Sequence, residues 1–543
     1  MRDEEKDQRV RPGWPRVALG ALSGALAGFA SLAVAELVAA AVRPQSSPVI
    51  AVGGAAIDAT PAAVKDWAIR HFGTNDKLVL QLGILAVLAV LALALGGLAV
   101  RFRRVGAAGV LLFGGIGAAA AVSRPDSSSL TDALPSVVGA VVGALLLYVL
   151  VGRLTAPARS KAGESGSLSE EGAGGPPVSE GWDRRGFVLA AGSAAAASVA
   201  AGAVGRSLNA SRGQGAVTSR NKLVLPSPQS PAQPIPVRAG LRVPGISSFV
   251  TPNADFYRVD TALVVPKVDA TTWRLRVHGK GVQHPRTYSF DDLLRRELIE
   301  RDITLTCVSN EVGGPYVGNA RWIGVRLADL LAECGVKPPS RGGPADQLVS
   351  RSVDGMTIGS PVEDVMDGRD AMLALGMNGR PLPFEHGFPV RMVVPGLYGF
   401  VSACKWIKDI ELTTFDSYDP YWVKRGWARR APIKTESRID TPKPFARPKA
   451  GTVMIAGVAW AQHRGIDKVE VRIDDGPWQE ADLAAEDTRD TWRQWSLPWR
   501  ATTGGHTLTV RATDRTGVVQ TDKRTRTIPD GASGWHSVVV TVE

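Results

Sequence analysis

The chain has 543 residues, which is too many for one compact core, so we expect about three or four structural units. Its three cysteines, Cys307, Cys334 and Cys404, lie far apart and exclude a disulfide scaffold, and no CxxC or CxxCH motif is present for a Cys-paired zinc site or a c-type haem. The net charge of +11 is spread along the chain without a basic repeat. We interpret it as membrane orientation together with an anion-binding site, and we expect no nucleic acid as a partner.

Four apolar stretches near the N-terminus are long enough to cross a membrane. At a rise of about 1.5 Å per residue, about 20 apolar residues span a hydrocarbon core of about 30 Å. The sequence therefore predicts an α-helical transmembrane bundle over residues 1–154. Its four stretches are Val17–Val42, Leu78–Val100, Val105–Val122 and Ala133–Val151.

Basic residues near the ends of these stretches predict their direction, because Lys and Arg are enriched on the cytoplasmic side. The Arg101–Arg104 turn should lie inside, the loop with Arg124 outside, and the chain should return to the cytoplasm at Arg153. A cytoplasmic N-terminus is expected from the five basic residues before the first stretch, which are Arg2, Lys6, Arg9, Arg11 and Arg16.

The first stretch also carries a glycine repeat and an acid. Gly20, Gly24 and Gly28 indicate either a smooth face for close helix packing or only the high frequency of Gly in membrane helices. Glu36 is either functional or reaches the interface from near the helix end. These stretches contain no histidine, so we expect no pair of haem ligands in them.

A flexible Gly/Ser/Glu-rich linker is predicted over residues 155–181, followed by a fifth transmembrane segment over residues 182–206. The pair Arg184-Arg185, with Phe187 two residues on, is similar to a twin-arginine export signal in an internal position; the alternative is an ordinary anchor helix with basic flanks. Either interpretation places the rest of the chain outside the cytoplasm. A tether is expected over residues 207–240.

The soluble part mixes strands and helices without a regular βαβ order, which predicts an α+β domain over residues 241–430. Local patterns in it predict strands over Thr272–His278 and Ile303–Cys307, a helix over Phe290–Leu298 capped by Ser289, and a helix over Leu327–Cys334 closed by Gly335.

Residues 431–543 have an all-β pattern. Short strand-like runs separated by turn clusters predict a β-sandwich of immunoglobulin-like type, without the disulfide. The runs are Met454–Trp460, Lys468–Ile473, Trp492–Trp499, His506–Ala512 and Ser537–Val542.

Two places in the soluble part carry candidate chemistry. Cys307 ends an apolar strand, where a thiol could be a core residue, a nucleophile or a metal ligand. Further on, His386, Arg391 and Lys405 bracket a Gly/Pro-rich turn. Fixed cations and backbone N–H groups at such a turn suit a phosphate, although a solvated basic loop is the alternative.

In order along residues 240–543, these pieces resemble the sulfite oxidase family of molybdopterin-dependent oxidoreductases. Each motif is weak alone, and their shared order makes the resemblance specific. The motifs are Phe256-Tyr257-Arg258, Thr306-Cys307-x-x-Asn310, Ala320-Arg321-Trp322, Asp354-Gly355, Met377-Asn378-Gly379, His386-Gly387-Phe388-Pro389-Val390-Arg391, Val394-Pro395-Gly396 and Lys405-Trp406, followed by the tail Gly457–Trp460 and His506–Asp514, which is similar to the family's dimerisation domain.

The resemblance implies one molybdenum–molybdopterin cofactor per chain, with Cys307 as the catalytic residue and the protein's metal ligand. It departs from typical sulfite-oxidising members at Glu311 and Val312, where they have two arginines. By the same resemblance, the residues that hold the pterin and its phosphate are Tyr257, Arg258, Asp354, His386, Arg391, Ser402 and Lys405.

The sequence thus predicts a multi-pass membrane protein whose catalytic domain faces outside the cytoplasm and transfers an oxygen atom in a two-electron reaction. One alternative, suggested by Tyr398-Gly399-Phe400, is reduction of a sulfoxide of the methionine sulfoxide type; another is a non-enzymatic cell-surface binding module. No haem motif is present, so we expect a small-molecule substrate and a separate electron carrier as partners. Membrane lipid and a homodimer through the C-terminal sandwich complete the expected partners.

Overall fold

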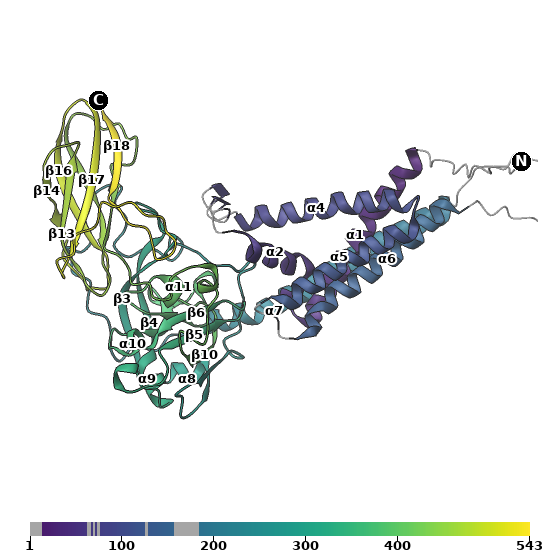
Figure 1. Ribbon diagram of the computed structural model, residues 1–543, viewed down its shortest axis with the longest axis horizontal. Helices are drawn as coiled ribbons and strands as arrows, with labels where there is room; N and C mark the ends of the chain where they lie inside the picture. The colour runs from purple at the N-terminus through teal and green to yellow at the C-terminus, as the bar shows by residue number, and fades with distance from the viewer. Residues whose placement is uncertain are drawn as a thin grey trace, which may run out of the picture. The chain divides into compact units, whose positions relative to one another are not determined.

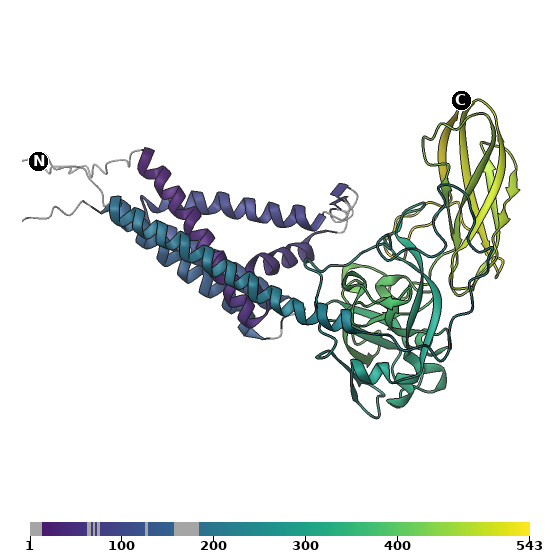
Figure 2. The ribbon, with the colours of Figure 1, turned by 180° about the vertical axis from the view of Figure 1, so that it is seen from behind.

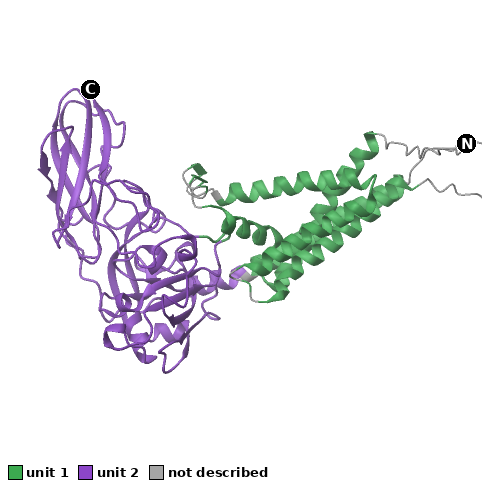
Figure 3. Cartoon of the chain, in the orientation of Figure 1, with its two compact units in different colours: residues 1–212, 261–264 green, residues 213–260, 265–543 purple. Residues whose placement is uncertain are grey.

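A computed structural model describes residues 14–61, 64, 67–68, 71–72, 76–124, 127, 129–156 and 184–543. The chain forms two compact units: residues 1–212 with 261–264, and residues 213–260 with 265–543 (Figure 3). Most of the predicted linker and the basic residues before Trp14 lie outside the described residues.

The first unit is helical, as the hydropathy predicted (Figures 1 and 2). Each predicted apolar stretch lies in one of the five described helices that are long and apolar enough to cross a membrane, judged by length and composition. These helices are α1 (Trp14–Val42), α4 (Asp76–Ala99), α5 (Arg103–Ser123), α6 (Leu134–Thr155) and α7 (Arg184–Lys222), joined by the shorter α2 (Pro48–Ala59) and the 3₁₀ turns η1 (Pro44–Ser46) and η3 (Leu130–Ala133).

The glycine repeat of α1 is a packing surface. A Cβ atom at Gly24 would lie 2.0 Å from the Ala92 carbonyl oxygen and 2.7 Å from the Gly96 Cα atom of α4. One at Gly20 would lie 2.9 Å from the Gly96 carbonyl oxygen. The two backbones therefore touch, and the packing interpretation of the repeat is confirmed.

Replacing Gly24 by alanine is therefore expected to destabilise the bundle by roughly 1–3 kcal/mol, because the added methyl group meets backbone and not a movable side chain. Thermal unfolding of the full chain in detergent measures the loss. Gly83→Ala is the matched control, since nothing lies within 4 Å of a Cβ at Gly83 of α4. Equal melting temperatures for the two variants would contradict the packing role.

Polar groups at one end of the bundle are paired. Glu36 is half-buried and accepts a hydrogen bond from the hydroxyl of Ser47, just before α2. Arg43 forms an ion pair with the buried Asp132, with 2.7 Å between Nη2 and Oδ2. Glu36 thus binds a neighbouring segment of its own unit. The sequence had suggested only a functional acid or one that reaches the membrane interface.

Helix α7 is longer than the predicted fifth segment. It continues past residue 206 to Lys222, so the predicted tether over residues 207–240 begins as helix. Arg220 fixes this end, since its Nε and Nη2 atoms donate to the carbonyl oxygens of Leu382 (2.6 Å) and Pro381 (2.9 Å). Basic residues in the last turn also favour the negative end of the helix dipole.

The second unit contains the predicted α+β region, built on two sheets around one hydrophobic core. One sheet has the order β2-β1-β10-β5-β6 and the other β3-β4-β7-β8, with β9 paired to β7; only the β1–β10 pair is parallel. The strands are β1 (Arg274–Gly279), β2 (Arg286–Ser289), β3 (Leu298–Thr306), β4 (Val317–Arg326), β5 (Gln347–Ser352), β6 (Thr357–Pro361), β7 (Met372–Met377), β8 (Arg380–Pro381), β9 (Arg391–Val393) and β10 (Ile407–Thr413).

Short helices connect these strands, and one predicted helix is too long. Ser289 caps α8 (Phe290–Leu294) in a capping box with Asp292, as predicted. The predicted extension to Leu298 is wrong, because Leu298 and Ile299 pair with Val325 and Gly324 as the start of β3. Helix α9 (Leu327–Glu333) is confirmed, followed by Gly335 at φ +78°; the remaining helices are α10 (Val362–Met366) and α11 (Gly399–Ser402), with the 3₁₀ turns η4 (Pro339–Arg341), η5 (Phe384–His386) and η6 (Val423–Arg425).

The C-terminal region is a β-sandwich of two four-stranded sheets, β11-β12-β16-β15 and β14-β13-β17-β18. Apolar residues of both sheets, among them Ile455, Trp495, Val471 and Val510, form one core. All five predicted runs are strands here, while the immunoglobulin-like relationship stays a prediction. The strands are β11 (Glu436–Thr441), β12 (Gly451–Trp460), β13 (Ile466–Ile473), β14 (Trp478–Glu480), β15 (Asp482–Leu483), β16 (Arg493–Ala501), β17 (Gly504–Asp514) and β18 (His536–Val542).

Candidate functional site

Cys307 directly follows β3 and begins a closed loop. Its backbone N–H donates to the Tyr316 carbonyl oxygen (2.9 Å), and its own carbonyl oxygen accepts from the Asn310 N–H (3.0 Å). The Asn310 side-chain oxygen accepts from the Tyr316 N–H (2.7 Å). These bonds fix the backbone on both sides of the thiol, which is 8% exposed.

The electrostatic surroundings of the thiol oppose its ionisation. Burial raises the pKa of Cys307, while hydrogen bonds from the backbone and side chain of Ser309 and the charge of Lys405 lower it. Binding of a cation to the sulfur would favour the thiolate.

A row of rings leads from the thiol loop to His386. The ring centroids of Tyr316 and Tyr257 lie 6.4 Å apart, those of Tyr257 and Phe256 5.1 Å, and those of Phe256 and His386 5.5 Å. His386 Nε2 lies 3.1 Å from the carbonyl oxygen of Asn253. Burial, followed by the charge of Arg391, lowers the pKa of His386 to about 4, so the imidazole is neutral at pH 7.

Arg391 is buried, and no carboxylate of the described residues forms an ion pair with it. The side chain is 5% exposed, and its Nη1 atom donates to the His386 carbonyl oxygen (3.3 Å). Its guanidinium carbon lies 5.0 Å from the Trp322 ring centroid. The Nε atom has no partner among the described residues, and burial lowers the pKa of Arg391 to about 10. A guanidinium in this position favours binding of an anion.

Gly387 brings Arg391 and Lys405 together. A Cβ atom there would lie 3.0 Å from the Arg391 Cβ and 3.1 Å from the Lys405 Cβ, and φ is +109°. Only glycine fits this close approach. Lys405 Nζ donates to Asp260 Oδ2 (2.7 Å), which also lies 3.6 Å from Arg258 Nε.

Asp354 belongs to the same neighbourhood, whereas Ser402 faces another way. Burial raises the pKa of Asp354, and the charge of Asp260 acts in the same direction. The Ser402 hydroxyl is fully buried and donates to the carbonyl oxygens of Leu397 (2.9 Å) and Tyr398 (3.0 Å). Ser402 therefore stabilises the turn at α11. Its hydroxyl is bound to this turn and not to the other residues predicted to hold the pterin.

Neither of the two positions that correspond to the family's arginines carries a cation in this chain. Glu311 is exposed and Val312 is buried. Of the cations further along the chain, Arg321 is bound to Asp302 (2.6 Å) and Arg429 to Asp419 (2.8 Å). These bonds commit both arginines to neighbouring carboxylates.

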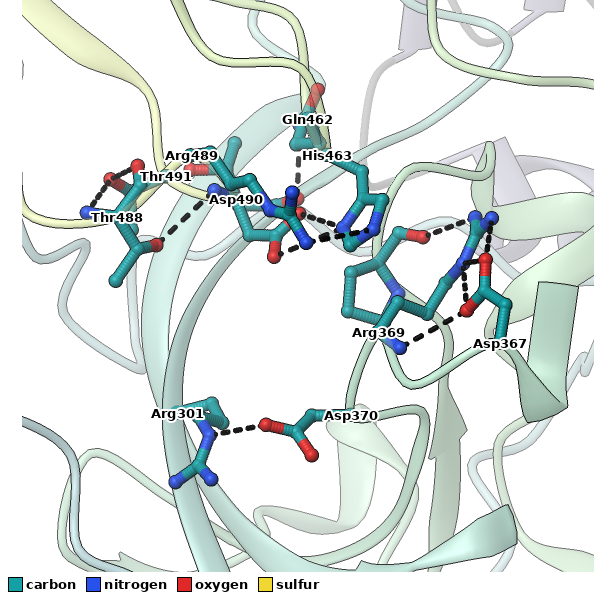
Figure 4. A network of polar contacts seen from close by, with 12 residues as sticks. Arg301, Asp367, Arg369, Asp370, Gln462, His463, Thr488, Arg489, Asp490 and Thr491 are labelled. Carbon is teal, nitrogen blue, oxygen red and sulfur yellow. Dashed lines mark hydrogen bonds and ion pairs between the residues drawn. The ribbon is translucent and has the colours of Figure 1, made fainter.

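The C-terminal sandwich supports β3, the strand that leads to Cys307. The Gln462 side-chain amide, buried at 1% exposure, donates to the Thr304 carbonyl oxygen (2.9 Å) and to the Thr306 hydroxyl (3.0 Å). The backbone N–H of Thr304 donates to the Asp490 carbonyl oxygen (2.9 Å). Figure 4 shows Gln462 near the ion pair of His463 with Asp490, and a separate ion pair of Arg369 with Asp367.

Replacing Gln462 by alanine is expected to lower the free energy of unfolding by about 1–3 kcal/mol, because two buried groups of β3 lose their donor. Chemical denaturation of the full chain measures this loss. Gln479→Ala on the exposed part of β14 is the control, expected to change stability by less than about 0.5 kcal/mol. Equal losses of unfolding free energy in the two variants would contradict the claim that Gln462 stabilises β3.

Sequence reasoning missed three residues of this neighbourhood: Asp260, Tyr316 and Asn253. Asp260 stands two residues after Arg258, and an acid so close to a predicted cofactor-binding arginine could have been predicted to pair with the site's basic residues. No local pattern marks Tyr316, which contributes its ring and its backbone, or Asn253, which contributes its carbonyl oxygen.

Comparisons with known proteins match the second unit. Residues 262–422 match the family model described as oxidoreductase molybdopterin binding domain, and residues 432–543 the one described as Mo-co oxidoreductase dimerisation domain. The mitochondrial sulfite oxidase of Rattus norvegicus is 31% identical over 291 residues, covering 46% of this chain and 53% of that protein. The chain thus spans about half the length of the curated sulfite oxidases it matches.

The matches to two further proteins cover larger shares of those proteins. The uncharacterized oxidoreductase YuiH of Bacillus subtilis (strain 168) is 34% identical over 162 residues, which cover 30% of this chain and 75% of that protein. The crystal structure of the sulfane dehydrogenase SoxCD from Paracoccus pantotrophus matches 54% of this chain and 83% of that chain, with 25% identity and a TM-score of 0.46.

Proposed function

The chain belongs to the sulfite oxidase family of molybdopterin-dependent oxidoreductases, and from this premise we propose that it is a membrane-anchored enzyme transferring an oxygen atom to or from a small substrate outside the cytoplasm. That it is a molybdenum-dependent oxidoreductase follows from the family and removes the alternative of a non-enzymatic binding module. The observation that carries the proposal is the common neighbourhood of Cys307, His386 and Arg391.

The residues present fit a molybdopterin. Arg391 has a buried Nε atom without a partner among the described residues, and Gly387 lets this cation and Lys405 lie close together. In the proposed site, Arg391 and Lys405 hold the pterin phosphate, and Tyr257, Arg258, Asp354 and His386 line the pterin. A neutral His386 can donate one hydrogen bond and accept another.

Cys307 would be the single protein ligand of the metal. Among the residues that the structure describes, no three His, Cys, Asp or Glu side chains are grouped to hold a metal ion. Molybdenum held by a pterin needs only one further ligand from the protein. A thiolate can be that ligand, because soft sulfur ligands suit molybdenum. When bound, the molybdenum cofactor supplies the two-electron chemistry; the protein orients it, excludes water and shapes the pocket.

Two substrates are considered: a sulfur oxyanion to be oxidised, and a sulfoxide to be reduced. The exposed Glu311 and the buried Val312 provide no cation for an oxyanion. This arrangement favours an uncharged group at the reacting atom and keeps sulfoxide reduction as the second candidate, because an acid near an anion costs affinity.

Steady-state assays of the full chain decide between the two candidates. One assay supplies sulfite with an artificial electron acceptor, the other methionine sulfoxide with an artificial donor, each with Cys307→Ser as the inactive control. Turnover of one compound by the wild type alone assigns the direction. A molybdenum-loaded protein that turns over neither compound would contradict both candidates.

We further propose that the helices of the first unit anchor the chain in the cell membrane, that electrons pass to or from a separate carrier, and that two chains associate through the sandwich. The apolar helices and the match to a dimerisation domain support these points. Protease digestion of intact cells tests the topology: loss of the second unit without lysis is expected, and its protection until lysis would contradict the proposed side.

A further inference from the structure

The loop that begins at Cys307, over residues 307–316, is closed on itself by hydrogen bonds. Two of these bonds involve the backbone of Cys307 itself. Another closes the far end of the loop, where the Gly314 N–H donates to the Glu311 carbonyl oxygen (2.7 Å). Gly313, the third residue of this four-residue turn, has a φ of +78°, as a type II turn requires. The thiol loop, residues 307–316, therefore has the sulfur at one end and this distal turn at the other.

Arg438, on β11 of the C-terminal sandwich, binds the distal turn. Its Nη1 atom donates to the Gly314 carbonyl oxygen (2.8 Å). The same guanidinium donates from Nε to Asp440 Oδ1 (2.7 Å) and from Nη2 to the Ser247 hydroxyl (3.0 Å). Arg438 is 9% exposed and Asp440 is 3% exposed. Because one planar cation binds three acceptors from three separate segments, it fixes the position of Gly314 relative to β11.

His536, on β18, contacts the neighbouring residue of the same turn. A Cβ atom at Gly313 would lie 2.9 Å from the His536 Cγ atom and closer still to its Cδ2 and Nε2 atoms. The backbone of the turn therefore lies directly against the imidazole ring. The Ile439 N–H donates to His536 Nδ1 (3.0 Å) and keeps the ring in place. Two residues on different strands of the sandwich thus hold two consecutive glycines of the distal turn.

We propose that Arg438 and His536 are positioning residues of the Cys307 site: they hold the distal turn, thereby fix the thiol loop, and so let the sandwich shape the substrate side of the site. This inference rests on the proposed function and holds for either direction of the reaction. Glu311 lies in the turn, and Tyr316 is hydrogen bonded to the Cys307 backbone. A displaced turn would therefore move the groups that border the thiol.

The first test is Arg438→Met, which removes the donor to the Gly314 carbonyl oxygen. In the loaded full chain, kcat/KM per bound molybdenum is expected to fall about 10- to 100-fold, with a lower kcat and a higher KM, as for a displacement of about 1 Å. The molybdenum content should stay at the wild-type level. A merely structural role would lower the amount of loaded protein but change neither KM nor kcat per bound molybdenum.

Arg493→Met is the matched control. Arg493 is also an arginine of the sandwich that binds backbone carbonyl oxygens, those of Ala484 (2.9 Å) and Ile466 (3.0 Å). Both acceptors lie within the sandwich and outside the thiol loop. The control is expected to keep the wild-type kcat and KM.

A second variant is needed because Arg438→Met leaves the buried Asp440 without its cation, which can prevent folding. His536→Asn keeps that ion pair and an acceptor for the Ile439 N–H, but it removes the ring atoms that lie against Gly313. Lower kcat and higher KM per bound molybdenum are expected for this variant as well.

Hydrogen exchange of the full chain without cofactor gives a readout that does not depend on activity. The amides of Asn310, Gly314 and Tyr316 are hydrogen bonded within the thiol loop. A peptide covering residues 308–316 should exchange at least about tenfold faster in Arg438→Met, as for the loss of one hydrogen bond to a charged group. Faster exchange is also expected in His536→Asn, and the wild-type rate in Arg493→Met.

These measurements separate the two proposals. A loaded wild type that turns over neither sulfite nor methionine sulfoxide contradicts the proposed function, while hydrogen exchange still tests the hold on the loop. Unchanged exchange of residues 308–316 in both variants, or an equal change in Arg493→Met, contradicts the positioning role. An active wild type whose kcat and KM per bound molybdenum are the same in both variants contradicts it too.

Discussion

Cys307→Ser is expected to lose bound molybdenum and to retain less than about 1% of wild-type turnover. Removing even an outer-shell partner of a metal ligand typically costs about 10- to 100-fold, and this change removes the ligand itself. A serine hydroxyl is harder and far more difficult to deprotonate than a thiol, and the burial that already raises the pKa of Cys307 opposes ionisation of serine further. Metal analysis and a steady-state assay on the purified full chain measure both effects.

Cys334→Ser is the matched control for this variant. Cys334 is equally a buried free thiol, but it lies at the end of α9, within 3.5 Å of the Tyr288 hydroxyl. The control is expected to keep its molybdenum and its rate, with at most a small loss of stability. Wild-type molybdenum content in Cys307→Ser would remove Cys307 from the metal site.

Arg391→Met is expected to have opposite effects on the free and the loaded protein. Without cofactor, the substitution removes a desolvated cation, so the melting temperature should stay unchanged or rise. With cofactor, it removes the partner of a buried anion, which costs about 2–5 kcal/mol and corresponds to roughly 30- to 4,000-fold weaker retention.

Retention is measured as molybdenum per chain after gel filtration, and stability as the melting temperature of protein without cofactor. Arg391→Lys is the control that keeps the charge but loses the bidentate geometry, so an intermediate retention is expected. A Met variant that melts several degrees lower without cofactor and yet retains its molybdenum would show that Arg391 is only structural.

The sequence predicts an element well where short-range physics decides it. The long apolar helices of the first unit follow from the length of the apolar stretches, and the cap at Ser289 from one hydroxyl placed before two acids. Prediction failed where tertiary pairing decides: Leu298 joins β3 because it pairs with Val325, and α7 continues to Lys222, where Arg220 binds carbonyl oxygens far away in the chain.

The same division applies to the site. The motifs around Cys307, His386 and Arg391 supplied the main residues of the proposed site, because the resemblance is carried by their order in the sequence. The bond between Lys405 and Asp260 joins residues 145 positions apart, and the bond between the Gln462 amide and the Thr304 carbonyl oxygen joins residues 158 positions apart. Only the folded chain brings such groups together, since no local pattern encodes the distance between them.

The central claim is that the sulfur of Cys307 binds molybdenum. X-ray absorption at the molybdenum edge tests it most directly, by comparing the sulfur atoms bound to the metal in the wild type and in whatever fraction of Cys307→Ser retains metal. We predict one sulfur more in the wild type, in addition to the two from the pterin dithiolene. An equal number of sulfur ligands in the two proteins would contradict the claim.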